Sequence, residues 1–263
     1  MLEFGGETLV LTQDTMVEGV HALPAQDPAD VAWKLVAVNL SDLAAKGAEP
    51  VGLLLSHSLG ENDRRFLTGL REAIEKFEAP LLGGDTVSMP HGAARSWTLT
   101  AFGRARHVPV PPRDGAQIGD ALYVTGPLGA AMMGFEALRD DTVADSTAYR
   151  RPCPRLAEGQ ALASHVTAMM DISDGLLLDA WRMGSASGKT LAIDRAAVPI
   201  AAPEHRRDDA LRWGDDYELL FTAPANTDFP CEVHRIGRAE AGSATVTLDG
   251  VPLTGPEDLG YQH

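Results

Sequence analysis

Aspartates recur beside small or hydroxyl-bearing residues at five places in the chain, and these clusters are the strongest candidates for chemistry. They lie at residues 13–15, 39–42, 83–86, 171–175 and 214–217. A single aspartate in such a setting is usually a solvated surface carboxylate. Five clusters of the same kind suggest instead that the fold collects them into one shared site.

Clustered carboxylate and hydroxyl oxygens suit Mg²⁺, which proteins usually hold through one or two carboxylates together with substrate phosphates. Phosphate chemistry is therefore the first hypothesis. The sequence contains no Gly-x-x-x-x-Gly-Lys-Ser/Thr motif, which argues against a P-loop enzyme. It also lacks the set of motifs that marks protein kinases.

The composition favours a folded, acidic protein. With 263 residues, 44% of them hydrophobic, the chain can form one large domain or two of ordinary size. Its 37 acidic and 22 basic residues give a formal charge of −15, which argues against a nucleic-acid partner. The charge fits recruitment of cations ahead of anionic substrates, but acidity that only improves solubility explains it equally well.

Cysteine content and hydropathy predict a cytoplasmic protein with no membrane partner. Cys153 and Cys231 show no Cys-x-x-Cys spacing, so we expect neither a disulfide framework nor a zinc site. No apolar segment reaches the ~18 residues typical of a membrane span. The N-terminus also lacks a basic region followed by an apolar run.

The helix that must position the second cluster begins at Asp27, which is a plausible N-cap before Pro28. Before it, residues 7–12 predict a strand that starts almost at the first residue, with no preceding element to pair with it. After it, residues 51–56 predict a buried strand. Residues 61–77 then predict an amphipathic helix whose apolar positions pack on a sheet: Phe66, Leu67, Leu70, Ile74 and Phe77.

The rest of the chain alternates strands and helices around a proline-dense segment at residues 107–115, the best candidate for a hinge between two domains. Residues 169–179 predict a strand that ends in aspartates and leads into a helix. The other predicted strands lie at residues 79–82, 96–102, 121–125, 191–194, 218–222 and 245–248.

Five motifs in register are specific enough to indicate a family. They occupy residues 15–21, 39–50, 83–86, 171–175 and 214–219, and they follow the order seen in thiamine-monophosphate kinases. The chain resembles that family, within the superfamily of aminoimidazole ribonucleotide synthetase, from about residue 7 to Tyr261. Val-Glu-Gly-Val-His at residues 17–21 and Asp-Asp-Tyr-Glu-Leu at residues 215–219 point to the thiamine branch.

The resemblance implies Mg²⁺-dependent transfer of the γ-phosphoryl group of ATP to thiamine monophosphate, giving thiamine diphosphate and ADP. No covalent nucleophile is expected, because positioning and charge neutralisation supply most of the catalysis in phosphoryl transfer. By similarity, the ATP-binding residues would be Gly84, Arg113 and Ser173. The substrate-binding residues would be His21, Glu218 and Tyr261. The metal ligands would be Thr12, Asp14, Asp42, Asp85, Asp171 and Asp174.

The three substrate-binding residues also have simpler interpretations. His21 could be a surface histidine after a turn, and Tyr261 could be a packing aromatic. Glu218 could be a charge at a strand edge, but it lies between Tyr217 and an apolar run, where an unpaired carboxylate would be costly. We therefore expect the thiazolium cation of the substrate to neutralise Glu218.

The expected fold is α+β with two domains. Residues 1–112 would form a β-sheet domain with flanking helices that binds ATP and metals and pairs with its twin in a homodimer. Residues 113–263 would form an α/β domain. The family has an earlier Gly-Asp-Asp-Ala-Ala stretch that is missing here, so we expect a truncated N-terminus. Two alternatives therefore stay open: another ATP-dependent synthetase of the superfamily, or an inactive nucleotide-binding homologue.

Overall fold

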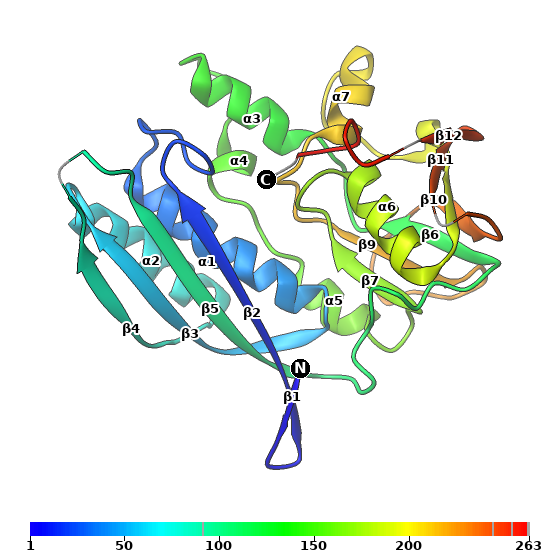
Figure 1. Ribbon diagram of the computed structural model, residues 1–263, viewed down its shortest axis with the longest axis horizontal. Helices are drawn as coiled ribbons and strands as arrows, with labels where there is room; N and C mark the ends of the chain where they lie inside the picture. The colour runs from blue at the N-terminus through cyan, green and yellow to red at the C-terminus, as the bar shows by residue number, and fades with distance from the viewer. Residues whose placement is uncertain (91, 244, 254, 262–263) are drawn as a thin grey trace.

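The computed structural model describes residues 1–90, 92–243, 245–253 and 255–261. Two β-sheets lie side by side, and each has its own helices (Figure 1). Separate groups of buried apolar residues form the interiors of the two halves. This arrangement confirms the predicted α+β class with an N-terminal sheet domain and a C-terminal α/β domain.

The N-terminal sheet has five strands in the order β1-β2-β5-β3-β4. Only β3 and β4 are parallel. The short β1 forms a hairpin with β2 across Gly5 and Gly6, both of which adopt the positive φ that such a turn needs. The expectation that nothing pairs with the strand at residues 7–12 is therefore wrong. The strands are β1 Leu2–Phe4, β2 Glu7–Val17, β3 Ala48–Leu59, β4 Leu81–Ser88 and β5 Ser96–Ala105.

Helices α1 (Pro28–Ala44) and α2 (Asp63–Phe77) cover one face of this sheet (Figure 1). The predicted start of α1 is confirmed, because the side chain of Asp27 accepts a hydrogen bond from the Ala29 N–H at 2.9 Å. The prediction for Leu67 is wrong: this side chain of α2 is 51% exposed. Neither helix covers the opposite, outer face, so Val51 and Leu54 of β3 are exposed, and the prediction that residues 51–56 form a buried strand is wrong.

The C-terminal sheet has seven strands in the order β12-β11-β8-β10-β6-β9-β7, and only the pair β8–β11 is parallel. The strands predicted around residues 121, 191, 218 and 245 are present, whereas β10 and β12 were not predicted. The residues of β10 are largely polar, so no apolar pattern predicted a strand there. The strands are β6 Asp120–Val124, β7 Ala168–Asp171, β8 Thr190–Ile193, β9 Leu219–Pro224, β10 His234–Glu240, β11 Val246–Leu248 and β12 Val251–Leu253.

The helices of this half are α3 Ala130–Arg139, α4 Thr147–Arg150, α5 Leu156–Leu162, α6 Leu176–Ser187 and α7 Arg207–Arg212, with 3₁₀ turns at Arg195–Ala197 and Glu204–Arg206. Helix α5 packs tightly on the end of α1. A Cβ atom at Gly159 would lie 2.0 Å from the carbonyl oxygen of Ala44, so only glycine permits this approach. The contact sets the C-terminal end of α1 against the second half. Among the described residues, no helix is both long and apolar enough to cross a bilayer.

Candidate active site

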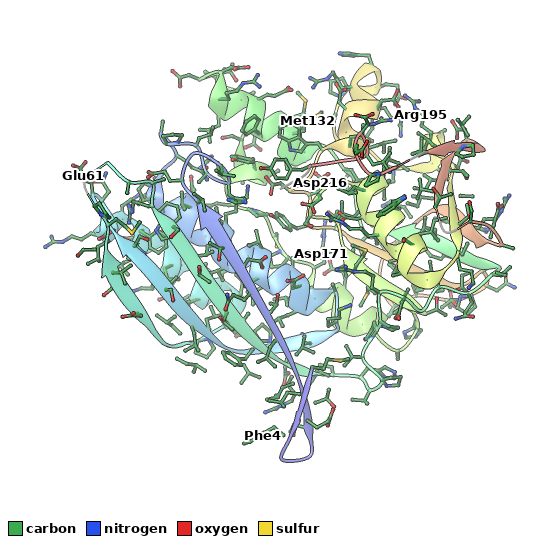
Figure 2. The ribbon with its side chains drawn as sticks, in the orientation of Figure 1. Phe4, Glu61, Met132, Asp171, Arg195 and Asp216 are labelled. Atoms are coloured by element: carbon green, nitrogen blue, oxygen red, sulfur yellow. The ribbon has the colours of Figure 1, made fainter. Side chains whose placement is uncertain are left out.

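A cavity of about 610 Å³ lies between the two halves of the molecule. Residues of β2 and α1 line one side. The other side comes from the loop after β7, the segment before β9, and helices α3 and α4. In Figure 2, Asp171, which lines the cavity, is labelled in the region between the two sheets. The cavity therefore draws on sequence segments that are far apart along the chain.

One end of the cavity is acidic. Four of the predicted metal ligands line it: Asp14, Asp42, Asp171 and Asp174. Strand β2 is held beside α1 by a hydrogen bond from the Asp14 N–H to Asn39 Oδ1, at 3.1 Å. Two residues further along α1, Ser41 Oγ donates to Asp171 Oδ2 at 2.6 Å. Helix α1 thus brings carboxylates of both halves together.

These carboxylates repel one another because they carry like charges within one cavity. Burial, and then the charges of Asp42 and Asp174, raise the pKa of Asp14 to about 6. Burial and the neighbouring Asp42 also raise the pKa of Asp171. Over the described ranges, no three Asp, Glu, His or Cys side chains are close enough to form a ready metal cage. Carboxylate oxygens along the cavity wall suit a hard cation that also takes oxygens from a phosphate.

The side chain of Asp179 on α6 fixes the loop that carries Ser173 and Asp174. The N–H groups of both loop residues donate to Asp179 Oδ2 at 3.0 Å, and Arg182 ion-pairs with Asp174 and Asp179. Burial raises the pKa of Asp179 to about 6. The sequence analysis assigned no role to Asp179, although a charge among the apolar residues of α6 was a usable signal.

The other end of the cavity is aromatic. The ring of Phe135 lies 5.2 Å from that of Tyr149 and 5.1 Å from that of Trp213, measured between centroids. His21 and Tyr261 line the same cavity. Sequence reasoning missed the three clustered aromatics, because they are scattered along the chain in different elements and share no motif.

Comparison with known proteins places this site in a family. The model of the AIR synthase related protein N-terminal domain matches residues 1–105, and that of the corresponding C-terminal domain matches residues 117–249. The thiamine-monophosphate kinase of Salmonella typhimurium is 39% identical over 83% of this chain and 72% of its own length. The chain belongs to the thiamine-monophosphate kinase family. The relative from Aquifex aeolicus is 30% identical over the whole chain and 90% of its own length.

Solved structures of thiamine-monophosphate kinases share the fold. A structure described as "AaThiL complexed with AMPPCP and TMP" has a TM-score of 0.88 and 30% identity, covering 97% of this chain and 87% of that one. The kinase from Stenotrophomonas maltophilia has a TM-score of 0.85 and 33% identity, with 95% and 87% covered. Hydrogenase maturation protein HypE from E. coli, at 21% identity and a TM-score of 0.78 over 96% and 86%, shares the fold alone.

Of the residues that resemblance to thiamine-monophosphate kinases singled out, Gly84 and Asp85 lie away from the cavity. Both belong to β4, an edge strand three positions from β2 in the sheet order, which corresponds to about 14 Å. Asp85 pairs with Ser56 on the uncovered outer face, whereas Asp14 points toward α1. Within one chain, Asp85 therefore cannot join the other predicted ligands.

Three further predicted residues lie at or beyond the edge of the kinase site. The Thr12 hydroxyl donates to the Asp42 carboxylate but does not line the cavity. Arg113 is exposed in the segment between the two halves. Glu218 is buried and already has partners: Arg155 Nε donates to it at 2.8 Å and Thr125 Oγ1 at 2.6 Å. Glu218 is therefore already paired within the chain, and its contact with the thiazolium cation of the substrate stays a prediction.

Proposed function

We propose that this chain transfers a phosphoryl group from ATP to thiamine monophosphate and forms thiamine diphosphate. The observation that carries the proposal is the single cavity with clustered carboxylates at one end and aromatic rings at the other. Such a cavity suits a substrate with a phosphate and a flat, cationic heteroaromatic part. Membership of the kinase family, and the related structure described with AMPPCP and TMP, support this choice.

Mg²⁺ is part of the proposal, and the donor set fits it. Asp14, Asp42, Asp171 and Asp174 offer hard oxygen ligands. The raised pKa of Asp14 reflects burial first and then repulsion from Asp42 and Asp174, which a cation would relieve. When bound, the ion would neutralise charge on the transferring phosphate and orient it. The protein's own part is to hold these carboxylates at fixed positions through Asn39 and Ser41.

The remaining residues would bind and orient the two substrates. Ser173 can offer only its hydroxyl to a nucleotide, because its backbone N–H is occupied by Asp179. The aromatic end would stack on the organic part of thiamine monophosphate and exclude water from it. Arg113 and Gly84 stay proposed ATP contacts, and His21, Tyr261 and Glu218 stay proposed substrate contacts.

A turnover assay tests the function directly. The purified chain is incubated with ATP, Mg²⁺ and thiamine monophosphate, and both products are quantified. We expect thiamine diphosphate and ADP in equal amounts, and neither when Mg²⁺ is chelated. ATP binding without thiamine diphosphate would favour the inactive homologue. ADP formed only with a different acceptor would favour another synthetase of the superfamily.

A homodimer through the outer face of the N-terminal sheet is a further part of the proposal. This face presents Leu11, Leu54 and Val87 as exposed apolar side chains, and such a surface commonly marks an interaction site. Leu54→Asp should therefore give a monomer in analytical ultracentrifugation. The control Leu67→Asp changes an exposed leucine on α2 and should leave the dimer intact. A wild-type monomer at micromolar concentration would contradict this proposal.

Asp85 lies on this same outer face, so its proposed metal role depends on what covers the face. We also propose a domain boundary near residue 112, within the segment that the two family matches leave between them. A cytoplasmic location is proposed because both cysteines are free and ATP is the intended donor. Fractionation of the producing cells would test the location.

A further inference from the structure

Lys34 is an unusual lysine. It lies on α1 with only 3% of its surface exposed, and it lines the cavity eight residues before Asp42. Burying an ammonium group is costly unless it is paired and hydrogen-bonded. The proposed transfer of a phosphoryl group assigns no role to this charge, so its partners indicate what it does.

The ammonium group has two partners, and both belong to the C-terminal half. Nζ lies 2.7 Å from Asp215 Oδ2 and 3.9 Å from the centroid of the Tyr149 ring. Tyr149 in turn packs edge-on against Phe135 at the aromatic end of the cavity. Lys34 thus links the helix that carries Asp42 to the aromatic wall on the other side of the cavity.

The backbone of Asp215 adopts a left-handed conformation. Asp215 and Tyr217 have φ values of 65° and 52°, which residues other than glycine rarely adopt. The Tyr217 hydroxyl donates to Asp215 Oδ1 at 2.7 Å, while Lys34 occupies Oδ2. Both carboxylate oxygens are therefore engaged, and the ammonium keeps this aspartate from adding an unpaired negative charge to an already acidic cavity.

We propose that Lys34 is a positioning residue that holds Asp215 and the Tyr149 ring in place as the wall of the aromatic end. It would thereby set the affinity for the organic part of the phosphate acceptor, a flat heteroaromatic cation. The inference rests on the proposed function. Because the contacts of the ammonium are to Asp215 and the Tyr149 ring, we infer that it acts through these residues and not by contact with the phosphate.

Steady-state kinetics of the full chain tests this role. Lys34→Met should raise the KM for thiamine monophosphate by about 10-fold or more, within the coupling expected for a shared network. The KM for ATP should change by less than about 3-fold, as for a substitution away from a binding contact. Lys34→Arg keeps the charge and should recover part of the loss. Lys76→Met, an exposed lysine of α2, is the matched control.

A double-mutant cycle separates positioning from direct contact. Asp215→Asn alone should also raise the KM for thiamine monophosphate, and the double variant should be no worse than Lys34→Met alone, because both changes break one pair. An unchanged KM in Asp215→Asn, or additive losses, would overturn the inference. So would a fall in kcat with unchanged KM in Lys34→Met. If Lys34→Met does not fold, the KM values of Lys34→Arg and Asp215→Asn for thiamine monophosphate still test the inference.

The same experiments distinguish a failure of the inference from a failure of the proposed function. If wild-type protein forms no thiamine diphosphate, the proposed function fails first, and the inference fails with it. If wild-type protein is active and the three variants keep its KM for thiamine monophosphate, only the inference fails. Thermal unfolding of each variant checks that a raised KM does not reflect partial unfolding.

Discussion

At the scale of single residues, the cavity concentrates negative charge on carboxylates that repel one another. Asp42 contributes most to this, because its charge helps to raise the pKa of both Asp14 and Asp171. The Thr12 hydroxyl is the contact that orients the Asp42 carboxylate from β2. The Asp42 carboxylate should therefore contribute to turnover while it lowers the stability of the folded chain.

Replacing Asp42 by Asn tests this division of roles. The change removes the charge and hardly alters volume, so we expect turnover at saturating Mg²⁺ to fall by at least ~10-fold, or roughly 1.4 kcal/mol of transition-state stabilisation. The unfolding temperature should stay equal or rise, because like-charge repulsion is relieved. Asp140→Asn, on the surface, is the control. Unchanged turnover would exclude Asp42 as a metal ligand.

The buried pair of Arg155 and Glu218 gives a second prediction at this scale. Arg155→Met leaves a buried carboxylate with only the Thr125 hydroxyl as a side-chain partner, so we expect a loss of about 2–3 kcal/mol of unfolding free energy, discounted because Arg155 is partly exposed. Adding Glu218→Gln to Arg155→Met should restore part of the lost unfolding free energy. Urea unfolding measures both. A double variant less stable than Arg155→Met would show that the carboxylate has another cationic partner.

At the scale of elements, helix α1 organises the site. Lys34, Val38 and Asp42 line the cavity at intervals of four residues, which places them on one stripe of the helix. A second stripe, which includes Leu35 and Leu43, packs into the N-terminal core. The two stripes explain how one helix can serve both the core and the cavity.

The stability of α1 depends on its cap, so we predict the effect of removing it. Asp27→Ala should lower the unfolding free energy by about 1 kcal/mol through loss of the N-cap. Asp27→Asn keeps the cap acceptor and loses only the exposed ion pair with Arg65, so it should cost less than about 0.5 kcal/mol. Denaturant unfolding measures the difference. Equal losses in the two variants would mean that the ion pair dominates.

The effect of Asp27 on stability should also depend on pH. The hydrogen bond from Arg65, followed by the bond from the Ala29 N–H, lowers the pKa of Asp27 against an opposing burial effect. A lowered pKa stabilises the folded chain above the unfolded pKa, and this contribution is lost as pH falls through the folded value. The stability difference between wild type and Asp27→Asn should therefore shrink below about pH 4. A constant difference down to pH 2 would contradict this assignment.

At the scale of the whole molecule, the formal charge of −15 and the acidic cavity predict a response to divalent cations. Ligands that bind only the folded state raise its stability by mass action. Millimolar Mg²⁺ should therefore raise the unfolding temperature more than NaCl of equal ionic strength, by roughly 2–4 °C for each kcal/mol gained. The shift should be smaller in Asp42→Asn. Equal shifts with both salts would mean that the free cavity holds no Mg²⁺.

Local features of the amino-acid sequence were enough to predict the family, the two-part α+β fold and four aspartates that share the cavity. This was possible because motifs, caps and apolar periodicity are local properties that a linear sequence displays. Asp27 illustrates this, since its capping role depends on a residue only two positions away. The same holds for the strand that ends at Asp171.

Only the tertiary structure decided which of the candidate residues meet. The face of β4 on which Asp85 lies depends on strand register, and a shift of one residue would turn every side chain to the other side. Glu218 finds Arg155, and Lys34 finds Asp215, across long stretches of chain. No local pattern carries such pairs, because the partners are 63 and 181 residues apart in the sequence and meet only in the folded chain.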